Sequence, residues 1–194
     1  MQSQSNPINF TNQFLIAMPG VTGPLFAGSV VYVCEHNERG ALGLVINRPT
    51  DINMATLFDK ISLKLEIAPL QNQPVLYGGP VQVERGFVLH ESREGTTYYS
   101  SLRVPGGLEM TTSKDVLEEV AAGTGPSRFL LTLGYAGWSA GQLENEVAHN
   151  GWLTVPANPS IIFDTPIEAR QDAAMALLGV GVSLLTLSTE AGHG

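Results

Sequence analysis

The chain has 194 residues, of which 43% are hydrophobic and 14% are charged, and its 10 basic and 18 acidic side chains give a formal charge of −8. This length and apolar content suit a single domain with a sizeable core and exclude a disordered chain. The acidic charge disfavours binding to nucleic acids and anionic membranes, because it is repelled by their phosphate groups.

The charged fraction is well below the ~25% of an average domain. Much of the surface must therefore be neutral or apolar. This favours a protein partner, or self-association as a homo-oligomer.

The ends of the chain and its cysteine content indicate a cytoplasmic protein. Residues 1–10 are polar and lack the basic and then apolar order of a secretory signal. Cys34 is the only cysteine, which excludes an internal disulfide and suits a reducing compartment. The apolar segment 175–187 is shorter than the ~20 residues of a membrane-spanning helix and is predicted to belong to the core. We expect one domain over residues 1–194, with residues 1–10 and 188–194 as flexible tails.

The first elements are predicted to be strands. Residues 15–18 form a short apolar run, and a loop with two prolines follows at residues 19–24. Residues 29–34 and 41–46 are β-branched and apolar on both faces, which is typical of buried strands. The polar residues 37–40 between them end in a glycine, so the pair is predicted to form a hairpin.

The rest of the chain alternates between strands and capped helices. Asp51 and Asn53 can cap a helix near residues 54–61, because their side-chain oxygens can accept hydrogen bonds from the unpaired backbone N–H groups of its first turn. Further strands are predicted at residues 74–77, 86–90, 97–102 and 129–133, and further helices from Ser113 to Gly123, from Ser139 to about His149 and from Thr165 to Leu178. Without regular βαβ alternation, the class is α+β with a mixed or largely antiparallel sheet and about four helices.

The first candidate site is the pair Cys34 and His36. In a regular strand, residues two apart share a face at a separation of ~6.6 Å, and an imidazolium near the sulfur would activate the thiol. In the other interpretation, Cys34 is a small core residue and His36 is merely polar at a turn. The remaining histidines are scattered and no second cysteine supplies ligand spacing, so neither a metal site nor a cofactor is predicted.

The second candidate is the glycine-rich segment from Leu133 to Gln142, which is predicted to turn from a strand into a helix. Such a turn could present backbone amides to an anion, although it matches neither of the glycine-rich nucleotide-binding motifs. The alternative is that its glycines permit a tight turn and let an indole pack on the sheet. The candidate ligand-binding residues here are Gly134, Tyr135, Gly137 and Trp138.

The third candidate is a set of residues at strand ends. Arg48 and Arg85 could clamp a carboxylate or a phosphate, or they could pair with the abundant acidic side chains. Gly78 and Gly79 belong to the same strand-end set. If the three candidates converge on one cleft, the ligand-binding set also includes His90.

Four blocks carry a family resemblance: FLIAMP at residues 14–19, SVVYVCEHNERGALGLVINRP at 29–49, GGPVQVERGFVLH at 78–90 and LGYAGWSAGQLE at 133–144. Together they resemble the AlgH/YqgE family of bacterial proteins, some of which are labelled as transcriptional regulators. The resemblance covers nearly the whole chain. It implies a cytosolic protein with a bifurcated sheet curled into a pseudo-barrel, and it supplies no proven catalytic residue.

Two positions depart from the family pattern. Gly23 stands where the family commonly has an aspartate, which removes a polar group from the first loop. Gln171 stands where an aromatic residue is usual, and we expect this to loosen helix packing rather than to change chemistry.

Three functions are compatible with these observations. The preferred hypothesis is a regulatory or accessory module that binds a small anion or a protein. The alternatives are a thiol-dependent enzyme or redox protein that uses Cys34 with His36, and a transcriptional regulator that acts without binding DNA directly.

Overall fold

The structure is a computed structural model that describes residues 8–18 and 23–179. These residues form a single α+β fold with one curled, largely antiparallel sheet, which confirms the predicted fold class. The strands are β1 (Gln13–Ala17), β2 (Val30–Asn37), β3 (Gly40–Val45), β4 (Pro49–Asn53), β5 (Pro74–Tyr77), β6 (Val81–Glu91), β7 (Ser101–Val104), β8 (Leu108–Thr111), β9 (Phe129–Ser139) and β10 (Trp152–Pro156).

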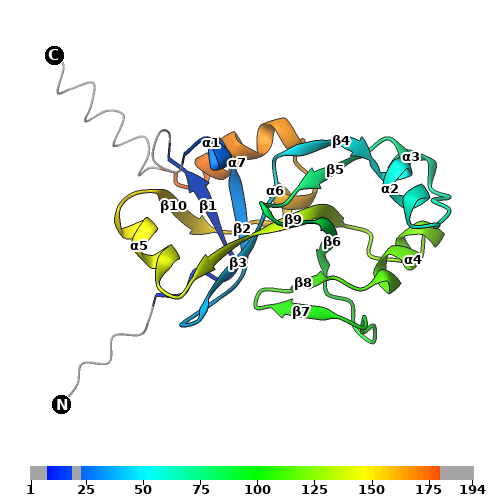
Figure 1. The fold of residues 1–194 in the computed structure, drawn as a ribbon, viewed down its shortest axis with the longest axis horizontal. Helices are drawn as coiled ribbons and strands as arrows, with labels where there is room; N and C mark the ends of the chain where they lie inside the picture. Colours follow the sequence, from blue (N-terminus) through cyan, green and yellow to red (C-terminus); the bar gives the residue numbers. More distant parts are fainter. Residues whose placement is uncertain (1–7, 19–22, 180–194) are drawn as a thin grey trace.

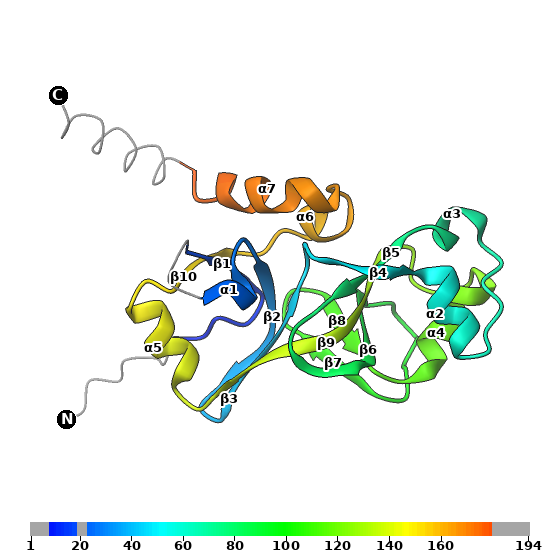
Figure 2. The same ribbon diagram turned by 45° about the horizontal axis from the view of Figure 1, so that its top comes forward.

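The sheet branches along β9, which runs through the middle of the molecule (Figures 1 and 2). On one side β9 pairs with β6. On the other side its first half pairs in parallel with β5, and its second half pairs antiparallel with β3. One arm therefore continues as β3-β2-β1-β10 and another as β6-β8-β7, while β4 joins β5 in a short third arm. The bifurcated sheet implied by the family resemblance is present.

Glycines make this branch point possible. The N–H of Gly78 donates to the carbonyl oxygen of Leu133 (2.8 Å), which brings the backbones of β5 and β9 together. A Cβ on Gly79 would lie 2.1 Å from the carbonyl carbon of Tyr135, and one on Gly134 would lie 2.3 Å from the carbonyl oxygen of Gly79. The φ angles of Gly79 and Gly134 are +154° and +78°, which side chains rarely tolerate. Three glycines of the predicted ligand set therefore have a structural role.

Helices lie at both ends of the molecule and over one side of the sheet (Figure 1). Four of them, α2, α4, α5 and α7, have seven residues or more, in agreement with the predicted number. Asn53 caps α2 by accepting the N–H of Thr56, and Gly123 ends α4 with a φ of +80°, both as predicted. The helices are α1 (Gly23–Phe26), α2 (Met54–Lys60), α3 (Ala68–Gln71), α4 (Lys114–Ala122), α5 (Gln142–Ala148), α6 (Pro159–Phe163) and α7 (Arg170–Ala176), with a 3₁₀ turn, η1 (Ile167–Ala169), before the last.

Three predicted elements differ from the structure. The glycine-rich segment is not a turn, because β9 continues to Ser139 before α5 begins. The strand predicted at 97–102 begins only at Ser101, because the N–H of Tyr99 donates to the side chain of Asp115. The last helix begins at Arg170, later than predicted. The hydroxyl of Thr165 donates to the carbonyl oxygen of Ser160 and therefore does not cap this helix. The sequence-based assignment missed β4, β8, β10 and the short helices α1, α3 and α6.

The predicted tails and loops are only partly covered by the described residues. Phe10, the last residue of the predicted N-terminal tail, is 6% exposed and packs into the core. Residues 1–7 and 188–194, most of the loop at 19–24, and residues 180–187 of the predicted core segment lie outside the described part of the chain. Across residues 8–18 and 23–179, no helix has the length and apolar character needed to span a bilayer.

Candidate functional site

Cys34 is sealed in the core. The side chain is 1% exposed and belongs to the same apolar cluster as Val30 and Tyr32, with which it alternates along β2. Burial, and to a smaller extent the carboxylate of Glu35, raises the pKa of the Cys34 thiol far above its usual value. A thiol held in this form is a poor nucleophile.

His36 does not share a face with Cys34. The pairing of β2 with β3 shifts register between Val33 and Glu35, and this bulge reverses the alternation of faces. The ring of His36 stacks on Phe10, in the cluster on the opposite side of β2 from Cys34. The predicted thiol–imidazole pair is therefore not formed.

We predict that native Cys34 is unreactive. Alkylation by iodoacetamide at mildly alkaline pH should be at least ~100-fold slower for the folded protein than for the unfolded chain, because reaction requires local opening of the core. Mass spectrometry of quenched samples measures both rates. A native rate comparable to that of the unfolded chain would restore the thiol enzyme hypothesis.

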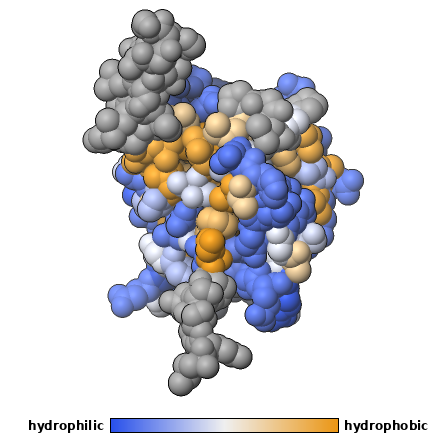
Figure 3. All heavy atoms as spheres, turned by 90° about the vertical axis from the view of Figure 1, so that its left-hand side faces the viewer, coloured by the Kyte–Doolittle hydropathy of each residue, from blue (hydrophilic) through white to orange (hydrophobic). Residues whose placement is uncertain are grey.

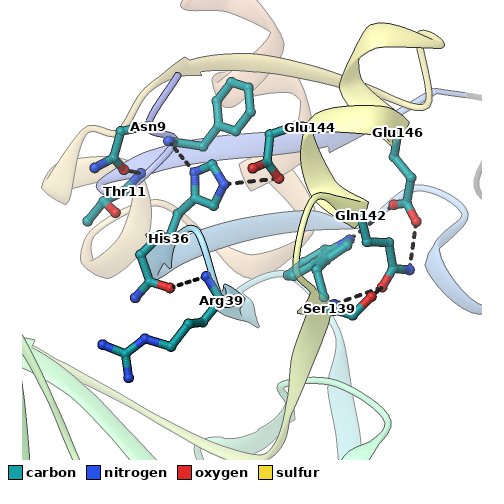
Figure 4. Close-up of polar contacts among 11 residues, drawn as sticks. Asn9, Thr11, His36, Arg39, Ser139, Gln142, Glu144 and Glu146 are labelled. Carbon is teal, nitrogen blue, oxygen red and sulfur yellow. Dashed lines mark hydrogen bonds and ion pairs between the residues drawn. The ribbon is translucent and has the colours of Figure 1, made fainter. Parts of the chain in front are cut away.

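The partners of His36 come from the N-terminal segment and from α5 (Figure 4). Its Nδ1 accepts the backbone N–H of Phe10 (2.9 Å), so in the neutral ring the proton is on Nε2. This Nε2 lies 3.2 Å from Oε1 of Glu144, close enough for an ion pair although the two atoms are not aligned as a hydrogen bond. The pKa of Glu144 is lowered, chiefly by its own backbone N–H, against the opposing effect of burial, and further by His36.

Both tryptophans of the chain bind one carboxylate. Trp138 of β9 and Trp152 of β10 donate their indole N–H groups to the same oxygen, Oε1 of Glu146, at 3.0 and 2.9 Å. The other oxygen accepts the side-chain amide of Gln142 (2.9 Å), whose carbonyl oxygen in turn accepts the backbone N–H of Ser139 (2.9 Å; Figure 4). The carboxylate thus joins two strands and α5.

The indoles form one wall of a hollow of about 290 Å³, which we call the tryptophan hollow. The two indole rings meet edge to face at 6.0 Å, and the ring of Phe26 meets Trp152 in the same way at 5.5 Å. The polar groups of the hollow come mainly from α5. Its principal side chains are those of Phe26, Trp138, Gln142, Glu146, His149 and Trp152.

A second, more open hollow of about 570 Å³ adjoins the first. Gly137 and Trp138 line both hollows. Tyr135 and Arg39 are among the residues that line the second hollow but not the first. The side chain of Arg39 extends away from His36 (Figure 4). Of the predicted ligand set, Tyr135, Gly137 and Trp138 therefore do lie together.

The two predicted arginines do not form a clamp. Arg48 donates to the carbonyl oxygen of Leu25 and lies over the ring of Tyr77, 5.7 Å from its centroid. Arg85 is exposed and lies over the ring of Phe87, 5.8 Å from its centroid. Since Tyr77 and Phe87 belong to strands that flank β9 on opposite sides, the two guanidinium groups cannot grip one anion.

His90 is also remote from the tryptophan hollow. The ring is completely buried, with Nδ1 2.9 Å from the carbonyl oxygen of Glu91 and Nε2 2.7 Å from the hydroxyl of Thr111. Burial lowers the pKa of His90, against the opposing effect of that carbonyl. His90 therefore helps to fix β6 against β8 and lines neither hollow.

The sequence-based assignment missed Glu146, Trp152 and Phe26. Each lies on an element that was not predicted or on the polar side of a predicted helix. The available signal was that Glu146 lies one turn after Gln142 and six residues before the second of only two tryptophans. An indole N–H that is buried needs an acceptor, and a nearby carboxylate is a natural one.

Comparisons with known proteins give consistent matches over the chain. A family model described as AlgH-like matches residues 14–183. The chain is 70% identical to a UPF0301 protein of Ralstonia nicotianae and 66% identical to a UPF0301 protein of Paraburkholderia phytofirmans. Each alignment covers 100% of this chain and 100% of the relative.

Two solved structures share the fold. The solution structure of the AlgH protein from Pseudomonas aeruginosa matches with a TM-score of 0.77 and 53% identity, and the match covers 95% of this chain and 97% of that one. An X-ray structure of a Corynebacterium diphtheriae protein matches with a TM-score of 0.63 and 24% identity, covering 82% and 81%. At that identity the second match supports the fold alone.

Proposed function

The chain belongs to the AlgH-like family, and we propose that it is a binding module whose tryptophan hollow takes an alkylammonium group. The observation that carries this proposal is a carboxylate, that of Glu146, held by neutral donors at the wall of an aromatic hollow. The ammonium group could belong to a free amine or to a lysine side chain of a protein partner.

The charge of Glu146 is not balanced. Its three donors are two indoles and an amide, none of which carries a charge. Among the described residues, no lysine, arginine or histidine lies within ion-pair distance of it, and the hollow is lined by no lysine or arginine and by one histidine, His149, which does not pair with it. A half-buried carboxylate of this kind is stabilised by any cation that reaches it.

The carboxylate also has room for one more donor. An ionised carboxylate offers about four lone-pair sites. Oε1 uses both of its sites on the two indoles, and Oε2 uses one on Gln142, so one site on Oε2 is free. An ammonium N–H can occupy it.

The aromatic walls favour the same ligand. Indole and phenyl faces attract cations, and aromatic rings gathered around a carboxylate are a common arrangement for binding alkylated ammonium groups. The face of the molecule that carries α5 also presents apolar patches between hydrophilic side chains, against which an alkyl chain can lie (Figure 3). The net charge of −8 attracts a cation from a distance.

Tryptophan fluorescence tests the proposal directly, because both tryptophans of the chain line the hollow. Titration with n-butylammonium at constant ionic strength should give a saturable change with a dissociation constant on the order of 1 mM. Butan-1-ol, which has the same chain without the charge, should give none. Titration with an N-acetyl-lysine amide compares a side-chain source with a free amine.

Glu146→Gln is the decisive variant. It keeps an oxygen acceptor for the indoles and removes the charge, so butylammonium binding should weaken about 5- to 30-fold. Glu144→Gln, on the same helix, is the matched control and should change binding less than about twofold. An equal loss in both variants, or an equal response to the alcohol, would contradict the proposal.

A further inference from the structure

A second hollow, away from the tryptophans, contains a buried guanidinium. Arg170 is 5% exposed and lines a hollow of about 350 Å³ between the α6–η1 segment and the strands β5 and β9. Helices α6 and α7 lie together over this side of the sheet (Figure 2). No residue is shared with the tryptophan hollow.

The protein satisfies only part of the guanidinium. Nε donates to the carbonyl oxygen of Thr165 (3.0 Å) and Nη1 donates to that of Ile46 (2.5 Å). A guanidinium has five N–H groups, so three remain without an acceptor among the described residues. Nη2 has no acceptor among the described residues, yet it is not one of the fully buried atoms that lack a partner, so it keeps some contact with solvent, and the hollow is lined by Arg170.

The charge of Arg170 is not neutralised by a contact either. Within the described part of the chain, Asp164 is the only acidic residue that lines the hollow, and Arg128 donates to it through Nη2 and through Nε (3.2 Å). None of the ion pairs among the described residues includes Arg170. Burial lowers the pKa of Arg170 to about 10, and the charge of Glu168 only partly opposes this. The group remains a cation at neutral pH.

Burying an unpaired charge is costly, and an anion that enters the hollow would offset that cost. The rest of the hollow is mostly apolar, with walls that include Leu76, Leu130, Phe163 and Ile167. A single guanidinium balances one negative charge and matches the two oxygens of a carboxylate. A phosphate dianion would leave a second charge against these apolar walls.

We propose that this hollow binds a small amphipathic monocarboxylate. Its carboxylate accepts the free N–H groups of Arg170, and its hydrocarbon part lies against the apolar walls. This is a binding site additional to the tryptophan hollow, for a ligand of opposite charge.

Hexanoate is a suitable probe for the experiment. Calorimetric or ligand-observed NMR titration of the full chain should give saturable binding at one site, with a dissociation constant on the order of 1 mM. Hexan-1-ol should bind at least ~10-fold more weakly, because it lacks the charge. If hexanoate does not bind, or if the alcohol binds equally well, the proposal is overturned.

Two variants locate the binding. Arg170→Met keeps most of the side-chain volume and should weaken hexanoate binding at least ~10-fold, since it removes charge-assisted hydrogen bonds. Arg103→Met, at an exposed position on β7, should leave the binding unchanged. Hexanoate binding that is equally strong in Arg170→Met would overturn the proposal.

A third variant decides the matter if Arg170→Met does not fold. Ile167→Trp leaves the guanidinium in place and fills the hollow, so hexanoate binding should be lost; unchanged binding would place the ligand elsewhere. Butylammonium binding, followed in Arg170→Met or Ile167→Trp, should be unaffected. Failure of this proposal is therefore distinguishable from failure at the tryptophan hollow.

Discussion

Gly79→Ala is expected to prevent stable folding. The new Cβ would lie 2.1–2.2 Å from the carbonyl carbon and oxygen of Tyr135, and both are backbone atoms that cannot rotate away. The residue would also have to adopt a φ of +154°. Because β5, β6 and β9 meet at this crossing, relief of the clash separates strands of the sheet. We expect the free energy of unfolding to fall by about 4 kcal/mol or more, which is a large part of a typical domain's stability.

Gly86→Ala is the matched control. Gly86 lies on β6, opposite Leu133 of β9, and a Cβ there would meet only a side-chain atom, at an ordinary 3.8 Å. Urea unfolding followed by circular dichroism should give a change of less than about 1 kcal/mol for Gly86→Ala. If Gly79→Ala unfolds at a similar urea concentration, the branch point is more adaptable than the close backbone contact indicates.

Local patterns were sufficient to predict much of the fold. The hairpin of β2 and β3 follows from β-branched residues on both faces and a polar turn ending in Gly40, and α4 follows from an apolar stripe closed by Gly123. The end of β9 could not be predicted in this way. Gly134 and Gly137 are typical of a turn, whereas here they lie in a strand that must pass close to another backbone. That requirement arises only once β5 and β9 are placed together.

The candidate site was less predictable, because its contacts join distant parts of the chain. Trp138 was identified from its glycine-rich surroundings, but its partner Glu146 is recognisable only when β10 brings Trp152 to the same oxygen. The bulge in β2 that separates Cys34 from His36 has no signature in the sequence. Family resemblance gave the bifurcated sheet, which local patterns did not.

Glu146→Ala tests the carboxylate as the link between β9, β10 and α5. It would leave two indole N–H groups without their acceptor, on side chains that are only 7% and 2% exposed. A buried donor without a partner costs about 1–3 kcal/mol, so we expect the free energy of unfolding to fall by about 2–5 kcal/mol. Glu146→Gln retains an oxygen and should lose only about 1 kcal/mol.

Urea unfolding measures these losses, and the two indole N–H resonances in an NMR spectrum report on the contact itself. Both resonances should move in Glu146→Ala. Neither should move appreciably in Glu144→Ala, because the carboxylate of Glu144 lies on the same helix but accepts no indole N–H. Glu144 is partly exposed and makes no hydrogen bond to the buried Nε2 of His36, so its removal breaks none, and we expect stability to change by only about 1 kcal/mol. Equal losses in Glu146→Ala and Glu144→Ala would mean that α5 is held by its general packing. The carboxylate of Glu146 would then contribute little to the stability of the fold, and ligand binding alone would have to explain its unbalanced charge.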